Sequence, residues 1–240
     1  GIESLVVAMG NKNYHSANNC ITETDTKTLV VGCKASVIPS DGSVTSIGQS
    51  AFWGCSGLTN ITIPDSVTSI GWGAFDCCSG LTSVTIGNSV TSIDSFAFSG
   101  CSGLTGITIP IGVTSIGYGA FRSCSGLTSI TIPDNVTSIG EYAFGYCSGL
   151  TSVTIGNSVT SIGDSAFYNC SGLKTVFYKG SAVQWNKISI DSYNGYLTNA
   201  TRYYYSETEP ALNAEGTAYD GNYWHYDTDG ITPVIWKKEN

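Results

Sequence analysis

The sequence predicts an α/β solenoid, in which a short unit repeats along the chain and each copy stacks on the previous one. Phenylalanine recurs every 23 residues, at Phe52, Phe75, Phe98, Phe121, Phe144 and Phe167. Cysteine and leucine keep the same spacing, from Cys55 to Cys170 and from Leu58 to Leu173. A fixed period of about 20–45 residues is typical of stacked repeat architectures. Six copies therefore occupy residues 44–181.

Each copy reads V-T-S-I-G-x-x-A-F-x-x-C-S-G-L-T-x-I-T-I-P-D-S, and its parts predict three sides of a coil. The part L-T-x-I-T-I alternates apolar and polar residues, which is the period of a β-strand. Equivalent strands one copy apart would pair in parallel. The part V-T-S-I predicts a second extended run, and G-x-x-A-F-x-x-C predicts one or two turns of helix or 3-10 helix. One copy buries too little apolar surface to fold alone, so the copies must stack.

This unit resembles the leucine-rich repeats of the BspA type, which occur in surface proteins of anaerobic bacteria, including the Treponema type. The resemblance rests on L-x-x-I-x-I together with A-F-x-x-C, and covers residues 44–181, with looser matches at 32–39 and 197–201. It implies a right-handed leucine-rich repeat superhelix with a parallel β-sheet on the concave face, short helical or 3-10 turns opposite, and irregular caps at both ends. It also implies attachment to the bacterial cell surface and adhesion to host matrix proteins or to other cells.

The first 43 residues predict an irregular cap. Ile2, Leu5 and Val7 share the spacing of the repeat strands, and Cys33 to Ile38 predicts the next strand. Between these two strands, Cys20–Ile21 and Leu29–Val31 predict a small hairpin.

The C-terminal end also departs from the repeat. Residues 182–206 form a degenerate last repeat, in which Leu197, Ala200 and Arg202 mark one final strand. Arg202 in an inward position indicates that no further layer covers it, because burying an unpaired charge is costly. Residues 207–240 predict an aromatic hairpin with a turn at Asp227–Gly230, which folds over the end of the stack or docks elsewhere.

Composition and charge argue against a nucleic-acid-binding protein and against an enzyme. The formal net charge is −8 and 12% of residues are charged, whereas a phosphate-binding surface needs clustered Lys and Arg. The chain has two His residues and no nucleophile-elbow, zinc or phosphate-loop motif. We therefore expect no catalytic residue, metal or cofactor. Residues 1–10 lack a basic n-region and no long apolar run occurs, so we expect no signal peptide and no membrane span in this chain.

Most of the nine cysteines are expected to be buried and free. Six of them occupy one position per copy, where stacked Cβ atoms would lie about 4.8 Å apart and point the same way. A disulfide needs a Cβ separation of about 3.8 Å and converging vectors. Cys77, next to Cys78, should point outward as a candidate reactive thiol, and a Cys20–Cys33 disulfide is an alternative for that pair.

Two surfaces are candidates for ligand binding. The first is the outward face of the strands, formed by Asn60, Thr62, Ser83, Thr85, Thr108, Ser129, Thr131, Ser152 and Thr154. The second is the turn side, where variable positions are aromatic: Trp53, Trp72, Phe96, Tyr118 and Tyr142, with Tyr146 and Tyr168. Exposed aromatic residues can anchor protein interfaces or stack on sugars. The alternatives without function are that threonine suits an exposed strand and that scattered surface aromatics are common.

We therefore expect a non-enzymatic exported or cell-surface bacterial protein that mediates adhesion or protein–protein interaction. The expected partner is a host extracellular-matrix or cell-surface protein, as the family resemblance implies, and no nucleic acid. One alternative is a structural spacer that holds another module away from the cell wall. Another is a carbohydrate-binding surface protein that uses the aromatic residues.

Overall fold

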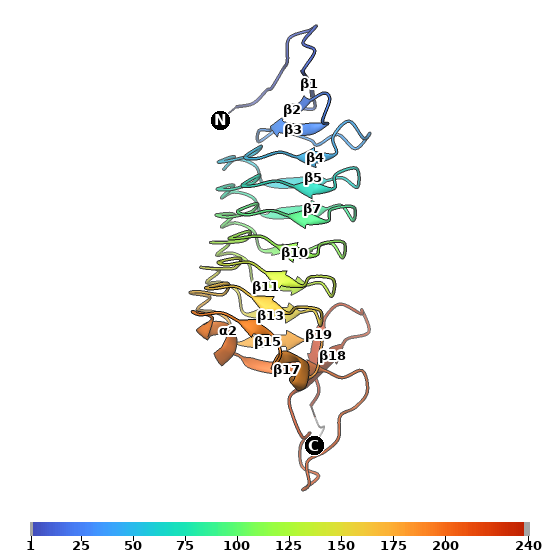
Figure 1. The fold of residues 1–240 in the computed structure, drawn as a ribbon, viewed down its shortest axis with the longest axis vertical. Helices are drawn as coiled ribbons and strands as arrows, with labels where there is room; N and C mark the ends of the chain where they lie inside the picture. Colours follow the sequence, from blue (N-terminus) through green and yellow to red (C-terminus); the bar gives the residue numbers. More distant parts are fainter. Residues whose placement is uncertain (1, 238–240) are drawn as a thin grey trace.

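In the computed structural model, which describes residues 2–237, the repeats stack into an elongated solenoid (Figure 1). The alternating part of each copy forms one strand of a parallel column: β5 (Asn60–Ile63), β7 (Ser83–Ile86), β9 (Gly106–Ile107), β11 (Ser129–Ile132), β13 (Ser152–Ile155) and β15 (Thr175–Tyr178). Strands pair with their equivalents in register, so that Thr131 lies opposite Thr154. The column is interrupted between β9 and β11, next to Gly106, and glycine weakens a strand because it has no side chain to pack.

The second extended run of each copy forms another parallel column, within a ten-stranded sheet. Its strands are β4 (Ser46–Ile47), β6 (Ser69–Ile70), β8 (Ser92–Ile93), β10 (Ser115–Ile116), β12 (Ser138–Ile139), β14 (Ser161–Ile162) and β16 (Ser189–Ile190). In each copy of the repeat the serine of this strand is at least partly accessible and the isoleucine is buried. The two columns therefore enclose one apolar core.

The third side of the coil is built of turns rather than of the expected helix or 3-10 helix. The backbone hydrogen bonds on this side join residues three apart in the chain, as from the Trp53 amide to the Ser50 carbonyl at 3.0 Å. A regular helix cannot form because each copy has two residues with positive φ on this side, such as Phe96 at 59° and Gly100 at 68°. The helices among residues 2–237 are α1 (Ala182–Trp185) and α2 (Gly195–Asn199), both after the last regular copy.

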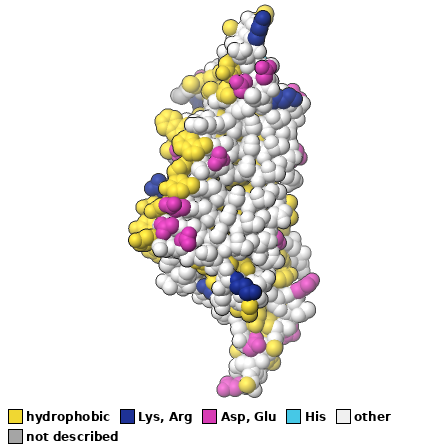
Figure 2. Space-filling view, in the orientation of Figure 1, with side chains coloured by type: hydrophobic (Ala, Val, Ile, Leu, Met, Phe, Trp, Pro, Cys, Tyr) yellow, Lys and Arg dark blue, Asp and Glu magenta, His cyan; other side chains and the backbone are white. Residues whose placement is uncertain are grey.

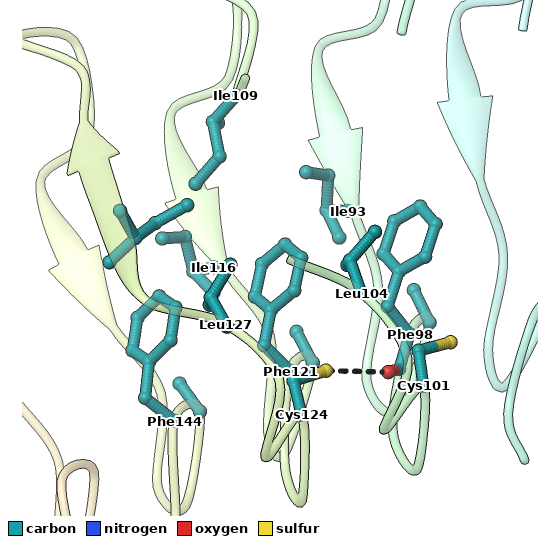
Figure 3. Close-up of a cluster of buried hydrophobic side chains, with 14 of the residues drawn as sticks. Ile93, Phe98, Cys101, Leu104, Ile109, Ile116, Phe121, Cys124, Leu127 and Phe144 are labelled. Carbon is teal, nitrogen blue, oxygen red and sulfur yellow. Dashed lines mark hydrogen bonds between the residues drawn. The ribbon is translucent and has the colours of Figure 1, made fainter. Parts of the chain in front are cut away.

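The phenylalanines form a column along the solenoid axis, which confirms that the copies stack in register. All six rings are fully buried, and adjacent centroids are 4.9–5.5 Å apart with nearly parallel planes. Figure 3 shows Phe98, Phe121 and Phe144 following one another, with Leu104 and Leu127 beside them. The strand spacing of about 4.8 Å sets this ring separation.

From the second copy onward, the glycine of the S-G-L segment lies against the backbone of the preceding layer. A Cβ on Gly149 would lie 2.3 Å from the Ser125 carbonyl oxygen. The same contact would be closer than 3.0 Å at Gly80, Gly103, Gly126 and Gly172. A side chain at this position would therefore separate the layers, which explains glycine in the second to sixth copies, whereas a Cβ at Gly57 would meet only the Lys34 side chain.

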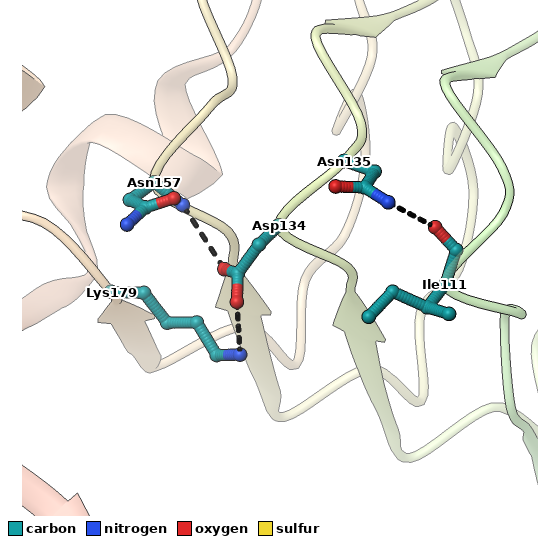
Figure 4. A network of polar contacts seen from close by, with 5 residues as sticks. All are labelled: Ile111, Asp134, Asn135, Asn157 and Lys179. Atoms are coloured by element: carbon teal, nitrogen blue, oxygen red, sulfur yellow. Dashed lines mark hydrogen bonds and ion pairs between the residues drawn. The ribbon is translucent and has the colours of Figure 1, made fainter.

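Side chains also join the layers on the edge formed by the P-D turns (Figure 4). The Asp134 carboxylate accepts hydrogen bonds from the backbone amide of Asn157 at 3.4 Å and from Lys179 Nζ at 2.9 Å. Asn135 Nδ2 donates to the Ile111 carbonyl at 2.8 Å. These contacts add polar links between copies to the apolar core, and the Lys179 contact reaches across two copies.

The N-terminal end contains the expected hairpin but neither of the two expected strands beside it. β1 (Tyr14–Ala17), β2 (Cys20–Glu23) and β3 (Thr28–Val31) pair antiparallel, and β3 then pairs in parallel with β4. The prediction of strands at residues 2–7 and 33–38 was wrong. Side chains replace strand partners there: the Leu5 amide donates to Asn19 Oδ1, and the Cys33 amide donates to Ser36 Oγ.

The last repeat contains the two short helices α1 and α2 and ends in a strand whose register differs from the predicted one. A capping box between Ser181 and Gln184 begins α1. β17 (Thr201–Tyr205) places Arg202, not Ala200, opposite Val176 of β15. The predicted start of the final strand at Leu197 was therefore wrong, since Leu197 lies in α2. Arg202 does point inward, with its guanidinium carbon 4.0 Å from the centroid of the Trp185 ring.

The C-terminal hairpin extends the strand column and lies along its outer face. β18 (Tyr223–Tyr226) pairs in parallel with β17 and antiparallel with β19 (Pro233–Ile235). Trp224 is fully buried, and its Nε1 donates to the Tyr178 carbonyl at 3.0 Å. Tyr226 and Ile231 share a surface hollow with Thr108 and Thr131. The hairpin therefore folds over the end of the stack, as one of the two predicted placements has it, and also reaches along the strand face, which the sequence did not indicate.

Candidate binding surfaces

The strand face presents the expected polar column over the first four copies only. Seven of the nine predicted residues are exposed: Asn60, Thr62, Ser83, Thr85, Thr108, Ser129 and Thr131. Ser152 is half-buried, and Thr154 is 5% exposed. The prediction that Thr154 faces solvent was therefore wrong. The face is uncovered near β5 and β7 and closed near β13 and β15.

The cause of this closure is the hairpin, which the repeat pattern does not encode. Trp224 packs on Phe177, whose ring centroid is 5.4 Å away, and Phe177 is the in-register neighbour of Thr154. Tyr226 lies beside Asp134, Asn157 and Lys179. Binding along the whole strand face would therefore require the hairpin to move.

The turn side carries a continuous row of aromatic side chains, which we call the aromatic ladder. It consists of Trp72, Phe96, Tyr118, Tyr142, Tyr146 and Tyr168. The first four rings contact one another in order, and both Tyr142 and Tyr146 contact Tyr168. The ring centroids of these pairs are 4.9–6.4 Å apart, and most pairs are edge to face. All six rings are exposed or half-buried, and the row forms part of the yellow column on the left of Figure 2. The predicted residues on this side therefore meet in one surface, except for Trp53, which is exposed but makes no ring contact with the ladder among the described residues.

Two neighbouring positions of the repeat alternate in supplying the first four rings of the ladder. Trp72 and Tyr118 occupy the first position and are each followed by glycine, whereas Phe96 and Tyr142 occupy the second. The second position has a positive φ in every copy. At Gly119 a Cβ would lie 2.9 Å from the Phe96 ring, so glycine there makes room for the neighbouring aromatic side chain.

Three ladder residues adopt a backbone conformation that is unfavourable for their type. Phe96, Tyr142 and Tyr146 have φ values of 59°, 53° and 64°. Bulky residues rarely adopt positive φ, and each such residue costs on the order of 1–3 kcal/mol. Glycine occupies the equivalent positions in other copies, for example Gly73 and Gly100. The aromatic side chains are therefore present at a cost in stability, which favours a role for them.

A hollow of about 670 Å³ continues the row beyond Tyr168. Tyr193 and Tyr196 line it together with Lys174 and Leu173. Tyr193 is largely exposed and has a φ of 61°. Sequence reasoning missed these two tyrosines because they follow the last regular copy, where the 23-residue spacing no longer assigns them a position.

The stacked cysteines form hydrogen bonds between layers in addition to filling the core. In five of the six the thiol donates to the carbonyl of a phenylalanine in the preceding copy, as from Cys124 Sγ to the Phe98 oxygen at 3.2 Å (Figure 3), whereas Cys55 Sγ donates to the Gly32 carbonyl at 3.7 Å. Cys78, Cys101, Cys147 and Cys170 repeat this contact at 3.0–3.2 Å. All nine cysteines are free, including Cys20 and Cys33. The expectation of a small apolar residue at this position therefore omitted a polar role.

Burial makes these thiols poor nucleophiles. It raises the pKa of Cys78 and of Cys170 to about 12, and that of Cys124 well above its usual value. Cys77 is exposed as expected, but partial burial and the neighbouring Asp76 carboxylate raise its pKa as well. Because the thiolate is the reactive form, the conditions for an activated cysteine are not met at these positions.

We expect iodoacetamide at neutral pH to label Cys77 slowly and to leave the seven buried cysteines of the folded protein unlabelled. The reason is that burial both blocks access and keeps these thiols protonated. Peptide mapping by mass spectrometry, with a guanidinium-unfolded sample as the control in which all nine cysteines react, measures this. Labelling of the buried cysteines at the rate of Cys77, or a Cys20–Cys33 disulfide, would contradict the structure.

Within residues 2–237, no group of three or more His, Cys, Asp or Glu side chains is arranged to hold a metal ion. No helix in this part of the chain has the length and apolar character needed to cross a membrane. The features that the described residues do offer for recognition are therefore extended surfaces.

A family model for the BspA-type leucine-rich repeat region, with six copies, matches residues 30–145 and 114–196. The chain belongs to the BspA-type leucine-rich repeat family. The match extends the repeats beyond residues 44–181 at both ends, into the irregular cap and the degenerate last repeat. Proteins of this family are generally binding scaffolds without enzymatic activity, and leucine-rich repeat domains generally mediate protein interaction.

Solved structures of bacterial leucine-rich repeat proteins resemble this member of the family. A leucine-rich repeat protein of Treponema pallidum is 28% identical, with a TM-score of 0.60 over 72% of this chain and 81% of that one. A leucine-rich cell surface protein of Faecalibacterium prausnitzii is 31% identical, with a TM-score of 0.55 over 75% of this chain. This chain covers 43% of the Faecalibacterium protein. No curated protein matches the chain.

Proposed function

We propose that this protein is a cell-surface binding scaffold of a bacterium that holds an extended protein partner along the aromatic ladder. The observation that carries the proposal is the ladder itself, with its rings in contact and three of them on an unfavourable backbone. A stacked core would be equally well formed with glycine or serine at those positions, since other copies have them. An unfavourable backbone conformation at exposed aromatic residues is typical of a recognition surface.

Family membership and the structural relatives support the surface location and the scaffold role. The partner we propose is a host extracellular-matrix or cell-surface protein, which suits an elongated surface that offers many small contacts. Of the two candidate surfaces the ladder is the better one, because the C-terminal hairpin occupies part of the strand face. The strand face near β5 and β7 stays the second candidate, since Thr62 and Thr85 are exposed there.

The test is binding of the purified chain to an array of matrix proteins, cell-surface proteins and glycans. A ladder variant, Trp72→Ser with Tyr118→Ser and Tyr168→Ser, removes three exposed rings. The matched control, Thr62→Gln with Thr85→Gln and Thr108→Gln, changes three exposed positions of the strand face. We expect the ladder variant to lose at least about tenfold in affinity for its protein ligand, because buried aromatic anchors dominate interface energies. The control should bind as the parent does, and thermal melts should show both variants folded.

Each alternative function has its own outcome in this experiment. Loss of binding in the control and not in the ladder variant would overturn the ladder and favour the strand face. Binding to glycans alone would favour the carbohydrate-binding protein. No ligand at all on the array would favour the structural spacer and contradict the proposal.

A further inference from the structure

The edge of the solenoid that carries the ladder is acidic. The six turn segments of this side contain one basic residue, Arg122, and four acidic residues: Asp76, Asp94, Glu141 and Asp164. The main chain of Glu141 and Asp164 adjoins the ladder, because their carbonyls accept hydrogen bonds from the backbone amides of Gly119 and Tyr142. Figure 2 shows Asp and Glu side chains beside the hydrophobic column on this edge.

These carboxylates are not neutralised by ion pairs within residues 2–237. The two ion pairs there join Lys34 to Glu3 and Lys179 to Asp134, and both lie elsewhere. The ladder edge therefore presents net negative charge beside exposed aromatic rings. The net charge of the whole chain, −8, has the same sign and adds a long-range contribution.

The ladder already holds one cation of this chain. The Arg122 guanidinium carbon lies 5.7 Å from the Tyr142 centroid and 5.2 Å from the Tyr146 centroid. Ring faces attract guanidinium and ammonium groups because their quadrupole is negative. Tyr118 and Trp72 are exposed ladder rings, and no Arg or Lys side chain of residues 2–237 lies over either ring. The same chemistry is therefore available to a partner at these rings.

From these observations we propose that the partner of the ladder is a basic segment of polypeptide, whose Arg and Lys side chains lie on the rings and pair with the flanking carboxylates. This inference rests on the proposed function and narrows its partner class. Arginine suits both the rings and the carboxylates of such a site, since its planar guanidinium stacks on aromatic faces and forms hydrogen-bonded ion pairs with carboxylates. Charge complementarity of this kind speeds association and selects among partners.

The test uses the full chain and three biotinylated 12-residue peptides, of alternating Arg-Ser, Glu-Ser and Gly-Ser sequence. Biolayer interferometry should detect the Arg-Ser peptide alone, with an affinity that falls at least about fivefold between 50 and 300 mM salt because exposed charges are screened. The variant Asp76→Asn, Asp94→Asn, Glu141→Gln and Asp164→Asn removes four carboxylates from the ladder edge. Its affinity should fall about tenfold, since exposed ion pairs each contribute a fraction of that factor.

A matched control removes four carboxylates at exposed sites elsewhere: Asp25→Asn, Glu207→Gln, Glu215→Gln and Asp220→Asn. Both variants carry the same net charge, so general attraction weakens equally in the two. The inference predicts a loss of less than about twofold in this control, where only long-range attraction changes. Equal losses in the two variants, or equal binding of the three peptides, would overturn it. An array ligand that needs the rings and ignores the carboxylates would overturn the basic partner and leave the proposed function standing.

Discussion

Replacing Phe121 with alanine should lower the free energy of unfolding by about 3–5 kcal/mol, as is usual for a buried phenylalanine. The ring is fully buried, with Phe98 at 5.5 Å on one side and Phe144 at 5.4 Å on the other. Its removal leaves a cavity in the middle of the column that the strand spacing does not allow to collapse. Guanidinium unfolding followed by circular dichroism and by tryptophan fluorescence measures the loss.

The shape of the unfolding transition tests the stacking separately. The stability of a repeat protein is approximately the sum of the stabilities of its repeats and of the contacts between neighbouring repeats. When a central contact is weakened, as in Phe121→Ala, the two halves of the stack should therefore unfold in separate transitions. Tryptophans lie near the two ends, for example Trp72 and Trp224, and report on both halves. Phe121→Leu, which keeps most of the apolar volume, should lose less than half as much stability and keep a single transition. A loss below about 1 kcal/mol for Phe121→Ala would contradict a close-packed column.

The regular part of the fold could be predicted from the sequence because each layer repeats the same physical problem. An apolar residue at every 23rd position can be buried in all copies only if the copies stack in register. The phenylalanine column and the parallel strands follow from that spacing. The cysteine thiol bonds do not, because the pattern gives the burial of Cys124 but not the direction of its Sγ.

The ends of the solenoid could not be predicted in the same way, because each contact there occurs once. The residues of the hairpin and of the sheet that it covers are far apart in the chain: Trp224 bonds the Tyr178 carbonyl across 46 residues with no repeating pattern. The burial of Thr154 follows from that contact and has no sequence signal. In the N-terminal cap, the buried residues Ser36 and Ile38 alternate with the exposed Val37 as in a strand, but side-chain hydrogen bonds of Ser36 take the place of strand pairing.

The candidate site was predictable residue by residue but not as a surface. The spacing placed Trp72, Phe96, Tyr118 and Tyr142 on one side of the coil. It did not indicate that the alternation of two adjacent positions, with glycine next to Trp72 and Tyr118, brings the rings into edge-to-face contact. That arrangement depends on positive φ at Phe96 and Tyr142, which side-chain type argues against.

Replacing Trp224 with alanine should detach the C-terminal hairpin from the strand face while the repeats stay folded. Trp224 is fully buried, packs on Phe177 and Tyr205, and donates a hydrogen bond to the Tyr178 carbonyl. Its loss should cost about 3–5 kcal/mol in the local stability of the hairpin, as for other large buried aromatics. Hydrogen exchange should therefore quicken in residues 223–235 and in β17, while the amides of β7 and β11 keep their protection.

The control and the secondary effect of this change separate docking from general destabilisation. Ile231, at the hairpin tip, is largely exposed, so Ile231→Ala should leave the exchange rates unchanged. Without the hairpin, β17 becomes an open sheet edge, and unpaired strand edges promote association between molecules. The Trp224→Ala protein should therefore elute earlier on size exclusion as its concentration rises, which Ile231→Ala should not do. Unchanged protection of β17 in Trp224→Ala would mean that other contacts hold the hairpin, and that Trp224 does not control access to the strand face.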